Sequence, residues 1–246
     1  MSQPKENPSS KRSFVVFAND PGTRNYGYAV LRVTVTKSKQ KKPTKSPITL
    51  HIEPLEHGIN CTVLDDLRTG KAIRQQLNGY LEFVQRIQTQ YSPTVFGAER
   101  FMVRRASSGV TTEYVAFMLG AAVHQLLPSM KSVRLLSAST WKNAFNRRTN
   151  GALEAIYAKA EELAAPKKFG LTPHQIDAYL IGVYVAHACL GLKGFEFLSK
   201  SFIRDMVKVA PPYQAATKSS RVKKKRTKKE TNQKETHHII QPSGTP

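Results

Sequence analysis

Three acidic residues of the chain stand where a carboxylate can do chemistry. Asp20 follows an apolar, strand-like segment at residues 14–18, and Glu99 ends a second such segment that begins at residue 94. Asp177 lies in the second turn of an otherwise apolar helical segment. Carboxylates that converge at a sheet end repel one another and lose hydration, which is costly unless a hard divalent cation holds them together. We therefore expect Asp20, Glu99 and Asp177 to form a metal site.

The charge of the chain indicates what such a site would act on. The sequence has 38 Lys and Arg against 17 Asp and Glu, with a formal net charge of +21, so a polyanion partner is expected. Carboxylate oxygens suit Mg²⁺ or Mn²⁺, and two such ions roughly 3.5–4 Å apart can drive in-line attack of water on a phosphodiester. Taken singly, each carboxylate has an ordinary interpretation as a turn or surface residue. Their conjunction in a basic chain predicts metal-dependent phosphodiester chemistry.

The two strand-like segments place their carboxylates on one face of a sheet. Side chains alternate along a strand, so Asp20 shares a face with Ala18, and Glu99 shares a face with Gly97. Both neighbours are small, which leaves room for a closely packed helix.

The helix that carries Asp177 has the clearest start in the chain. Thr172 caps it, Pro stands at the first helical position, and Gln175 completes a capping box. His174 is three residues before Asp177, so both side chains point the same way. A stripe of small residues around Gly182 permits close approach to the sheet.

The order of the elements predicts the fold class. Strands come first in a hairpin meander, after which strand and helix alternate, which is typical of an α/β fold with a mixed five-stranded sheet flanked by helices. We expect strands at residues 14–18, 26–35, 48–63, 94–98 and 132–136, and helices at residues 69–91, 111–127, 139–146, 151–164 and 172–190.

Charge runs divide the chain further. Residues 208–246 hold ten Lys or Arg and two Glu, and eight of the basic residues fall within residues 218–229. We expect a disordered N-terminal arm at residues 1–13, one ordered domain at residues 14–207 with a Lys-rich loop at residues 36–47, and a disordered basic tail at residues 208–246. The loop and the tail are candidate nucleic-acid contacts.

No run approaches the ~18 apolar residues of a membrane span, and the polar start lacks the apolar stretch of a secretory signal. We expect an intracellular, cytoplasmic protein without a membrane partner. The basic tail could also act as a targeting signal.

Four segments around the carboxylates carry a family pattern. Residues 19–31 hold an Asp-Pro-Gly-Thr-Arg turn followed by a strand with Gly-Tyr-Ala-Val, and Glu99 is followed by an arginine and an aromatic residue. Residues 137–142 form a helix start that ends in Lys142, and residues 174–178 read His-Gln-Ile-Asp-Ala. In order and at plausible spacing over residues 14 to about 192, these segments resemble the RuvC-type Holliday junction resolvases.

The resemblance implies a ribonuclease-H-like fold and a homodimer that nicks four-way DNA junctions symmetrically, leaving 5′-phosphate and 3′-hydroxyl ends. It implies Mg²⁺ as cofactor, with two ions per site and Mn²⁺ as a substitute, and no small-molecule substrate. The implied metal ligands and catalytic residues are Asp20, Glu99, His174 and Asp177. The Lys-rich insert and the tail match no family feature and suggest a viral or otherwise divergent member, which, if viral, would act in the host cytoplasm.

The candidate DNA-binding residues combine the resemblance with the basic runs. Phe101 follows Glu99 by two residues where the family has three, so either Phe101 or Met102 is the junction-probing side chain. The family's basic stretch after the fifth strand is reduced, so its role falls to Arg147 or Arg148. The full set is Arg24, Arg100, Phe101, Met102, Arg104, Arg105, Lys142, Arg147, Arg148, Lys223, Lys224, Lys225 and Arg226.

Two other functions compete with a junction resolvase. A ribonuclease-H-like nuclease could act on flaps, forks or RNA–DNA hybrids, because the metal site alone does not choose the substrate. A non-catalytic basic DNA-binding protein would explain the charge but would leave the three carboxylates without a role. The homodimer is expected to use apolar faces of the helices at residues 69–91 and 111–127, although the sequence does not say which faces pack internally.

Overall fold

The structure is a computed structural model that describes residues 11–22, 26–37, 48–60, 70–100, 109–148, 153–164 and 171–191. The chain divides into two units, residues 1–213 and 214–246, and all of the described ranges belong to the first. Residues 1–10 of the predicted arm, most of the predicted Lys-rich loop and the predicted basic tail lie outside the described residues.

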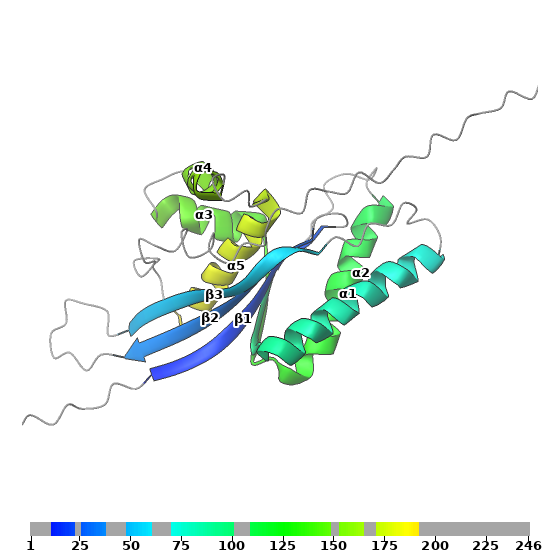
Figure 1. Ribbon diagram of the computed structural model, residues 1–246, viewed down its shortest axis with the longest axis horizontal. Helices are drawn as coiled ribbons and strands as arrows, with labels where there is room; N and C mark the ends of the chain where they lie inside the picture. The colour runs from blue at the N-terminus through cyan, green and yellow to red at the C-terminus, as the bar shows by residue number, and fades with distance from the viewer. Residues whose placement is uncertain are drawn as a thin grey trace, which may run out of the picture. The chain divides into compact units, whose positions relative to one another are not determined.

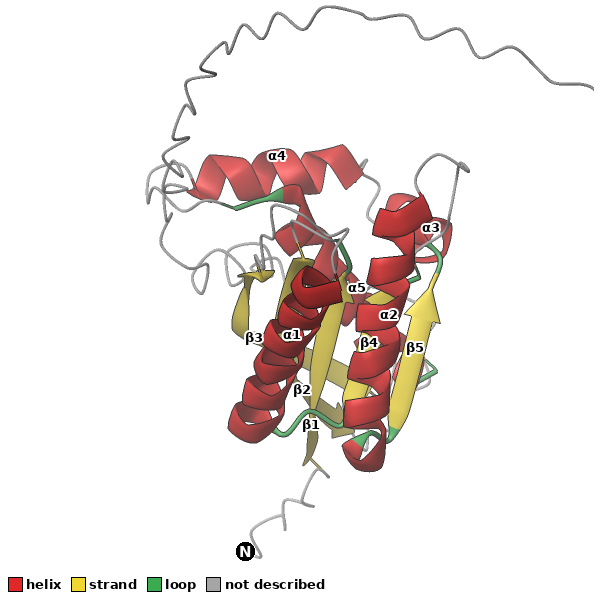
Figure 2. Cartoon of the chain, turned by 90° about the vertical axis from the view of Figure 1, so that its right-hand side faces the viewer, coloured by secondary structure: helices red, strands yellow, loops and turns green. Residues whose placement is uncertain are grey.

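A mixed five-stranded sheet forms the centre of the first unit (Figures 1 and 2). The strands are β1 (Lys11–Asp20), β2 (Tyr26–Lys37), β3 (Ile48–Asn60), β4 (Val95–Glu99) and β5 (Ser132–Leu136). Their order is β3-β2-β1-β4-β5, in which β1 to β3 form an antiparallel meander and β4 and β5 run parallel to β1. The predicted mixed five-stranded sheet flanked by helices is confirmed.

Helices cover both faces of the sheet (Figure 2). They are α1 (Gly70–Tyr91), α2 (Gly109–Leu126), α3 (Ala138–Arg148), α4 (Leu153–Ala164) and α5 (Pro173–Cys189), and a short 3-10 helix, η2 (Leu127–Ser129), follows α2. Alternate residues of β1 enter two cores: Val16 and Ala18 pack with α3, α4 and α5, whereas Phe17 packs with α1 and α2. Within the described ranges, none of these helices is long and apolar enough to cross a membrane.

Several strand ends differ from the prediction because backbone pairing continues past the apolar residues. β1 begins at Lys11, which pairs with Thr36, so residues 11–13 of the predicted arm belong to the sheet. β2 reaches Lys37, so the first two residues of the predicted Lys-rich loop are strand residues. An antiparallel ladder is held by main-chain hydrogen bonds, which polar side chains do not interrupt.

Small residues bring α5 close to the sheet, as the alternation argument predicts. A Cβ added to Gly97 would lie 2.6 Å from Val185 Cγ2, and one added to Gly182 would lie 2.6 Å from Leu31 Cδ1 and 3.1 Å from Ala18 Cβ. The helix also begins where the sequence predicts, with the full capping box of Thr172 and Gln175. The cap and the close packing together fix the first turns of α5 beside the end of β1.

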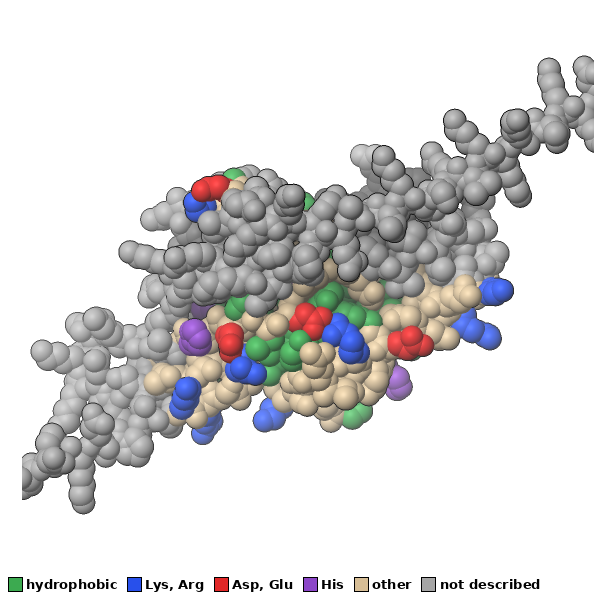
Figure 3. Space-filling view, viewed as in Figure 1, with side chains coloured by type: hydrophobic (Ala, Val, Ile, Leu, Met, Phe, Trp, Pro, Cys, Tyr) green, Lys and Arg blue, Asp and Glu red, His purple; other side chains and the backbone are tan. Residues whose placement is uncertain are grey.

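A carboxylate on β3, Glu56, ties α1 to the sheet. Arg86 donates to both of its oxygens at 2.6 and 3.0 Å, and the hydroxyls of Tyr28 and Tyr91 each donate at 2.7 Å. Burial acts to raise the pKa of Glu56, but the hydrogen bonds from Arg86 and the two tyrosines outweigh it and lower that pKa to about 2. Acidic and basic side chains also lie side by side on the face of the molecule shown in Figure 3.

We expect Glu56→Gln to lower the free energy of unfolding at pH 7 by about 1–3 kcal/mol, since its three donor side chains lose a charged acceptor and solvent screens part of the effect. The pKa of Glu56 is lower in the folded chain than in the unfolded chain, so its contribution is complete above about pH 4.5 and is lost as the pH falls towards about 2. Urea unfolding across this range should show the difference between variant and wild type shrinking. A difference that does not change with pH would refute the assignment, and Glu162→Gln, at an exposed ion pair with Lys159, is the control.

Candidate active site

Three carboxylates meet at one edge of the sheet. Asp20 ends β1 and Glu99 ends β4, and the two strands are parallel neighbours, so their last residues emerge at the same edge. Asp177 faces them from the second turn of α5. Each residue offers one oxygen, and these oxygens lie within 4.8 Å of one another. The structure thus brings together the three residues that the sequence singles out.

The electrostatics of this cluster fit a hard divalent cation. Asp20 and Asp177 are only 8 % and 9 % exposed. Burial raises the pKa of the Glu99 carboxyl, and the neighbouring charges of Asp20 and Asp177 raise it further. Burial also raises the pKa of Asp177. Negative charge is therefore concentrated in a poorly hydrated place, and a set of carboxylate oxygens is the donor chemistry that Mg²⁺ and Mn²⁺ prefer.

His174 contacts one of the three carboxylates directly. Its Nδ1 lies 2.7 Å from Asp20 Oδ2, and its side chain is 44 % exposed. The hydrogen bond with Asp20 raises the pKa of the imidazole, and the charges of Asp177 and Glu99 act in the same direction. His174 therefore lies beside the three carboxylates, and its service as a fourth metal ligand stays a prediction.

Helix α3 adds two side chains to the site. Trp141 is fully buried and packs edge-on against Phe145 one turn later, which anchors the helix in the core. Its indole Nε1 donates to Glu99 Oε2 at 2.9 Å. The next residue, Lys142, donates from Nζ to Asp177 Oδ2 at 3.2 Å and lies 4.9 Å from the centre of the Trp141 ring. Lys142, predicted as a DNA contact, is thus a neighbour of the carboxylates.

Helix α4 contributes one further hydrogen bond. Leu153, Ile156 and Ala160 are buried in the core, and this apolar stripe holds the helix against its neighbours. Tyr157 follows Ile156, and its hydroxyl donates to Asp177 Oδ1. Burial raises the pKa of Tyr157, and the bond to Asp177 adds to the rise, so the phenol keeps its proton and remains a donor at neutral pH.

The sequence did not single out Trp141 or Tyr157 as site residues. Trp141 is the only tryptophan of the chain and precedes a lysine of the family pattern, which is a weak signal that could have drawn attention to it. Tyr157 lies beside an apolar stripe at helical spacing, and nothing in that pattern connects it to Asp177.

The structure describes only some of the predicted DNA contacts. Arg100 is exposed directly after Glu99, and its backbone N donates to Leu136 O at 2.6 Å. Arg147 and Arg148 lie in the last turn of α3, with side chains that the structure does not describe. The remaining predicted contacts lie outside the described residues: Arg24, Phe101, Met102, Arg104, Arg105, Lys223, Lys224, Lys225 and Arg226.

The fold and the site define an α/β protein with the predicted mixed five-stranded sheet and an acidic cluster at the sheet edge. No family model and no curated protein matches the sequence. Solved structures similar to the chain include Thermus thermophilus RuvC, with a TM-score of 0.48 and 16 % identity over 72 % of this chain and 96 % of that one. RuvC of the same organism in complex with a Holliday junction substrate has a TM-score of 0.47 and 17 % identity, with the same coverage.

The yeast mitochondrial Holliday junction resolvase Ydc2 is also similar, with a TM-score of 0.40 and 12 % identity over 79 % of each chain.

Proposed function

We propose that the protein is a metal-dependent endonuclease that resolves four-way DNA junctions. The observation that carries the nuclease activity is the convergence of oxygens from Asp20, Glu99 and Asp177 within 4.8 Å. Three carboxylates gathered at one edge are costly for a protein that only binds DNA, and they are useful to one that hydrolyses phosphodiesters. The net charge of +21 favours a nucleic-acid substrate, and the four motif segments favour the junction.

In this proposal Asp20, Glu99 and Asp177 hold Mg²⁺ or Mn²⁺, with His174 as a fourth ligand. When bound, the ions activate a water and stabilise the charge that develops on the phosphodiester. The chain's own cations hold the substrate: the Lys142 ammonium, beside Asp177, can donate to a phosphate oxygen, and exposed Arg100 can contact the DNA backbone next to the site. Cleavage leaves 5′-phosphate and 3′-hydroxyl ends.

The test is a cleavage assay on synthetic four-way junctions, three-way junctions, flaps, linear duplexes and RNA–DNA hybrids. Each is incubated with Mg²⁺, with Mn²⁺, or with a chelator. We expect paired nicks in the four-way junction only when metal is present, with ends that a DNA ligase can rejoin. Faster cutting of flaps or hybrids would favour the alternative nuclease, and junction binding without cutting in metal would favour the non-catalytic protein.

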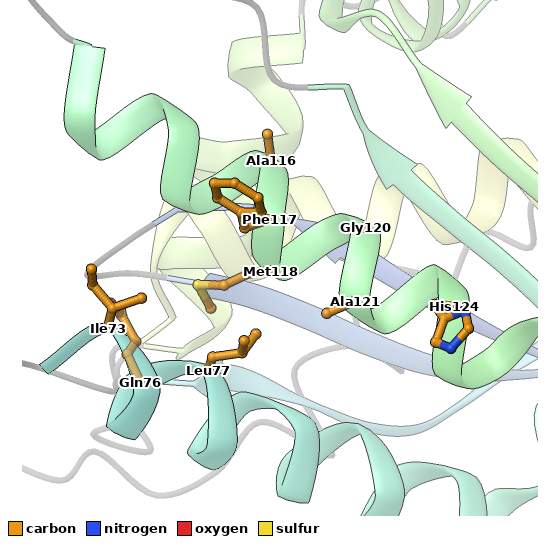
Figure 4. A pocket seen from close by; sticks show the side chains of 9 residues that line it. All are labelled: Ile73, Gln76, Leu77, Ala116, Phe117, Met118, Gly120, Ala121 and His124. Atoms are coloured by element: carbon orange, nitrogen blue, oxygen red, sulfur yellow. The ribbon is translucent and has the colours of Figure 1, made fainter. Parts of the chain in front are cut away.

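The proposed activity needs two active sites, because the junction has two-fold symmetry. An apolar cavity of about 580 Å³ opens between α1 and α2, and Figure 4 shows Ile73 and Leu77 on one side and Met118 on the other. Phe117 also lines this cavity and is 69 % exposed. An exposed ring on the wall of an apolar cavity can pack against the same surface of a second copy, as a two-fold interface requires. We propose that a second copy of the chain covers this face.

Phe117→Glu should therefore weaken dimerisation by about 30-fold or more, since a buried aromatic anchor is worth about 2 kcal/mol or more at an interface. Sedimentation should show a shift to monomer, and junctions should receive single nicks instead of paired ones. Leu127→Glu is the control, because Leu127 is also exposed but does not line the cavity. A Phe117→Glu protein that remains dimeric would exclude this face as the interface.

A further inference from the structure

Each of the three carboxylates is held by a donor from another element. His174 contacts Asp20, and Trp141 donates to Glu99, in each case at one of the two oxygens. Asp177 is held at both, with Tyr157 on Oδ1 and Lys142 on Oδ2. The two donors to Asp177 differ in charge: a metal ion at the cluster repels the ammonium of Lys142, whereas the neutral hydroxyl of Tyr157 can stay in place.

We propose that Tyr157 is a positioning residue, which holds Asp177 by Oδ1 so that Oδ2 is the oxygen offered to the metal ion. This inference rests on the metal site of the proposed function. The carboxylate torsion of an aspartate is broad, so Asp177 by itself has no strong preference for the angle at which its oxygens face Asp20 and Glu99. A hydrogen bond to one oxygen removes this freedom before the ion arrives.

The placement of Tyr157 suits this role. Its helix is anchored by Leu153 and Ile156, each 6 % exposed, and by fully buried Ala160. Because α4 is fixed to the core, the phenol is a rigid support for Asp177. Outer donors that orient metal ligands typically contribute 10–100-fold to metal affinity, so the loss of this single hydroxyl is measurable.

The chain contains its own reporter of metal binding. Trp141 is the only tryptophan, and its indole N–H donates to Glu99 at 2.9 Å. Mg²⁺ or Mn²⁺ titrated into the full chain without DNA should therefore change the tryptophan fluorescence. We expect Tyr157→Phe to raise the half-saturating metal concentration about 10–100-fold. Calorimetry on the same samples gives the affinity independently of the fluorophore.

Two further variants separate the hydroxyl from the ring. Tyr91→Phe removes a tyrosine hydroxyl that donates to another carboxylate, Glu56, at 2.7 Å, and should leave the metal affinity unchanged. Tyr157→Leu removes the ring as well as the hydroxyl. If positioning is the role of Tyr157, the Phe and Leu variants lose similar affinity. An affinity loss confined to the Leu variant, with a matching fall in thermal stability, would overturn the inference in favour of packing.

The outcomes for Tyr157 and for the nuclease are distinguishable. Wild-type metal affinity in Tyr157→Phe overturns the positioning role and leaves the proposed function untouched. A wild-type protein whose metal affinity depends on Tyr157 but which cuts no junction supports the positioning role and overturns the proposed function. A wild-type protein that binds neither Mg²⁺ nor Mn²⁺ overturns both.

Discussion

Asp177→Asn is expected to slow metal-dependent cutting of four-way junctions by about a thousand-fold or more while junction binding survives. Stabilisation of transition-state charge by a bound metal is worth several kcal/mol, and each 1.4 kcal/mol is about ten-fold in rate. The amide keeps the shape of Asp177 but removes the charge that a cation needs. It also removes repulsion between the site and the phosphate backbone, so affinity for the junction should not fall. Asp20→Asn and Glu99→Gln should behave alike.

The same substitution has a second signature, in stability. Burial raises the pKa of Asp177, so keeping this group charged at neutral pH opposes folding in the absence of a cation. We expect the metal-free Asp177→Asn protein to unfold at a temperature equal to or above that of the wild type, and to gain less stability from added Mg²⁺. Gel-based cleavage, junction binding in chelator and thermal unfolding check the three parts.

The control for Asp177→Asn is Glu162→Gln, which removes an exposed carboxylate paired with Lys159 on α4. This variant should match the wild type in cutting, binding and stability. Wild-type cutting by Asp177→Asn would refute the metal site. Cutting lost together with thermal stability would point to a structural carboxylate.

The positions of Asp20 and Glu99 on their strands could be predicted because side chains alternate between the two faces of a strand. Side chains alternate and a strand ends at a turn, so the sequence predicts the face and the strand end of each carboxylate, whereas the structure adds that β1 and β4 are parallel neighbours. Asp177 could be predicted because Thr172 and Gln175 fix where its helix begins. In all three cases the local sequence sets the face on which the side chain lies and its position along the strand or helix.

The roles of Trp141 and Tyr157 could not be predicted in the same way. Trp141 meets Glu99 across 42 residues, and Tyr157 meets Asp177 across 20 residues, through the packing of α3 and α4 against α5. Helical periodicity shows which residues share a face but not the direction in which the helix crosses its neighbours. The same limit applies to α1 and α2: their apolar residues were visible, but only the fold shows that Tyr80 and Val84 face the core and Phe117 faces outwards.

Gly27 on β2 lies in close contact with the backbone of the first turn of α5. Gly27 pairs with Asp20 across β1 and β2, and a Cβ added to it would lie 2.6 Å from the carbonyl carbon of His174 and nearer still to its oxygen. The atoms in the way belong to the backbone, so no change of rotamer can relieve the overlap. Gly27→Ala must therefore push the first turn of α5, which carries His174 and leads into Asp177, away from Asp20.

We expect Gly27→Ala to lower the free energy of unfolding by about 1–3 kcal/mol, as overpacking of a tight contact does. The effect on cutting should be larger, because a displacement of about 1 Å in a catalytic group can cost about 100-fold in rate. Both are measured at a temperature where the variant is folded, by urea unfolding, by junction cleavage and by metal titration followed through Trp141.

Gly70→Ala is the matched control for Gly27→Ala, since a Cβ on Gly70 meets nothing within 4 Å. Gly70 is the first residue of α1, so the substitution should change stability little and should not change cutting. If Gly27→Ala lost stability but cut normally once folded, the first turn of α5 would have room to move without disturbing the carboxylates. The contact between Asp20 and His174 would then lie outside the catalytic geometry, and the metal site would depend on Asp20, Glu99 and Asp177 alone.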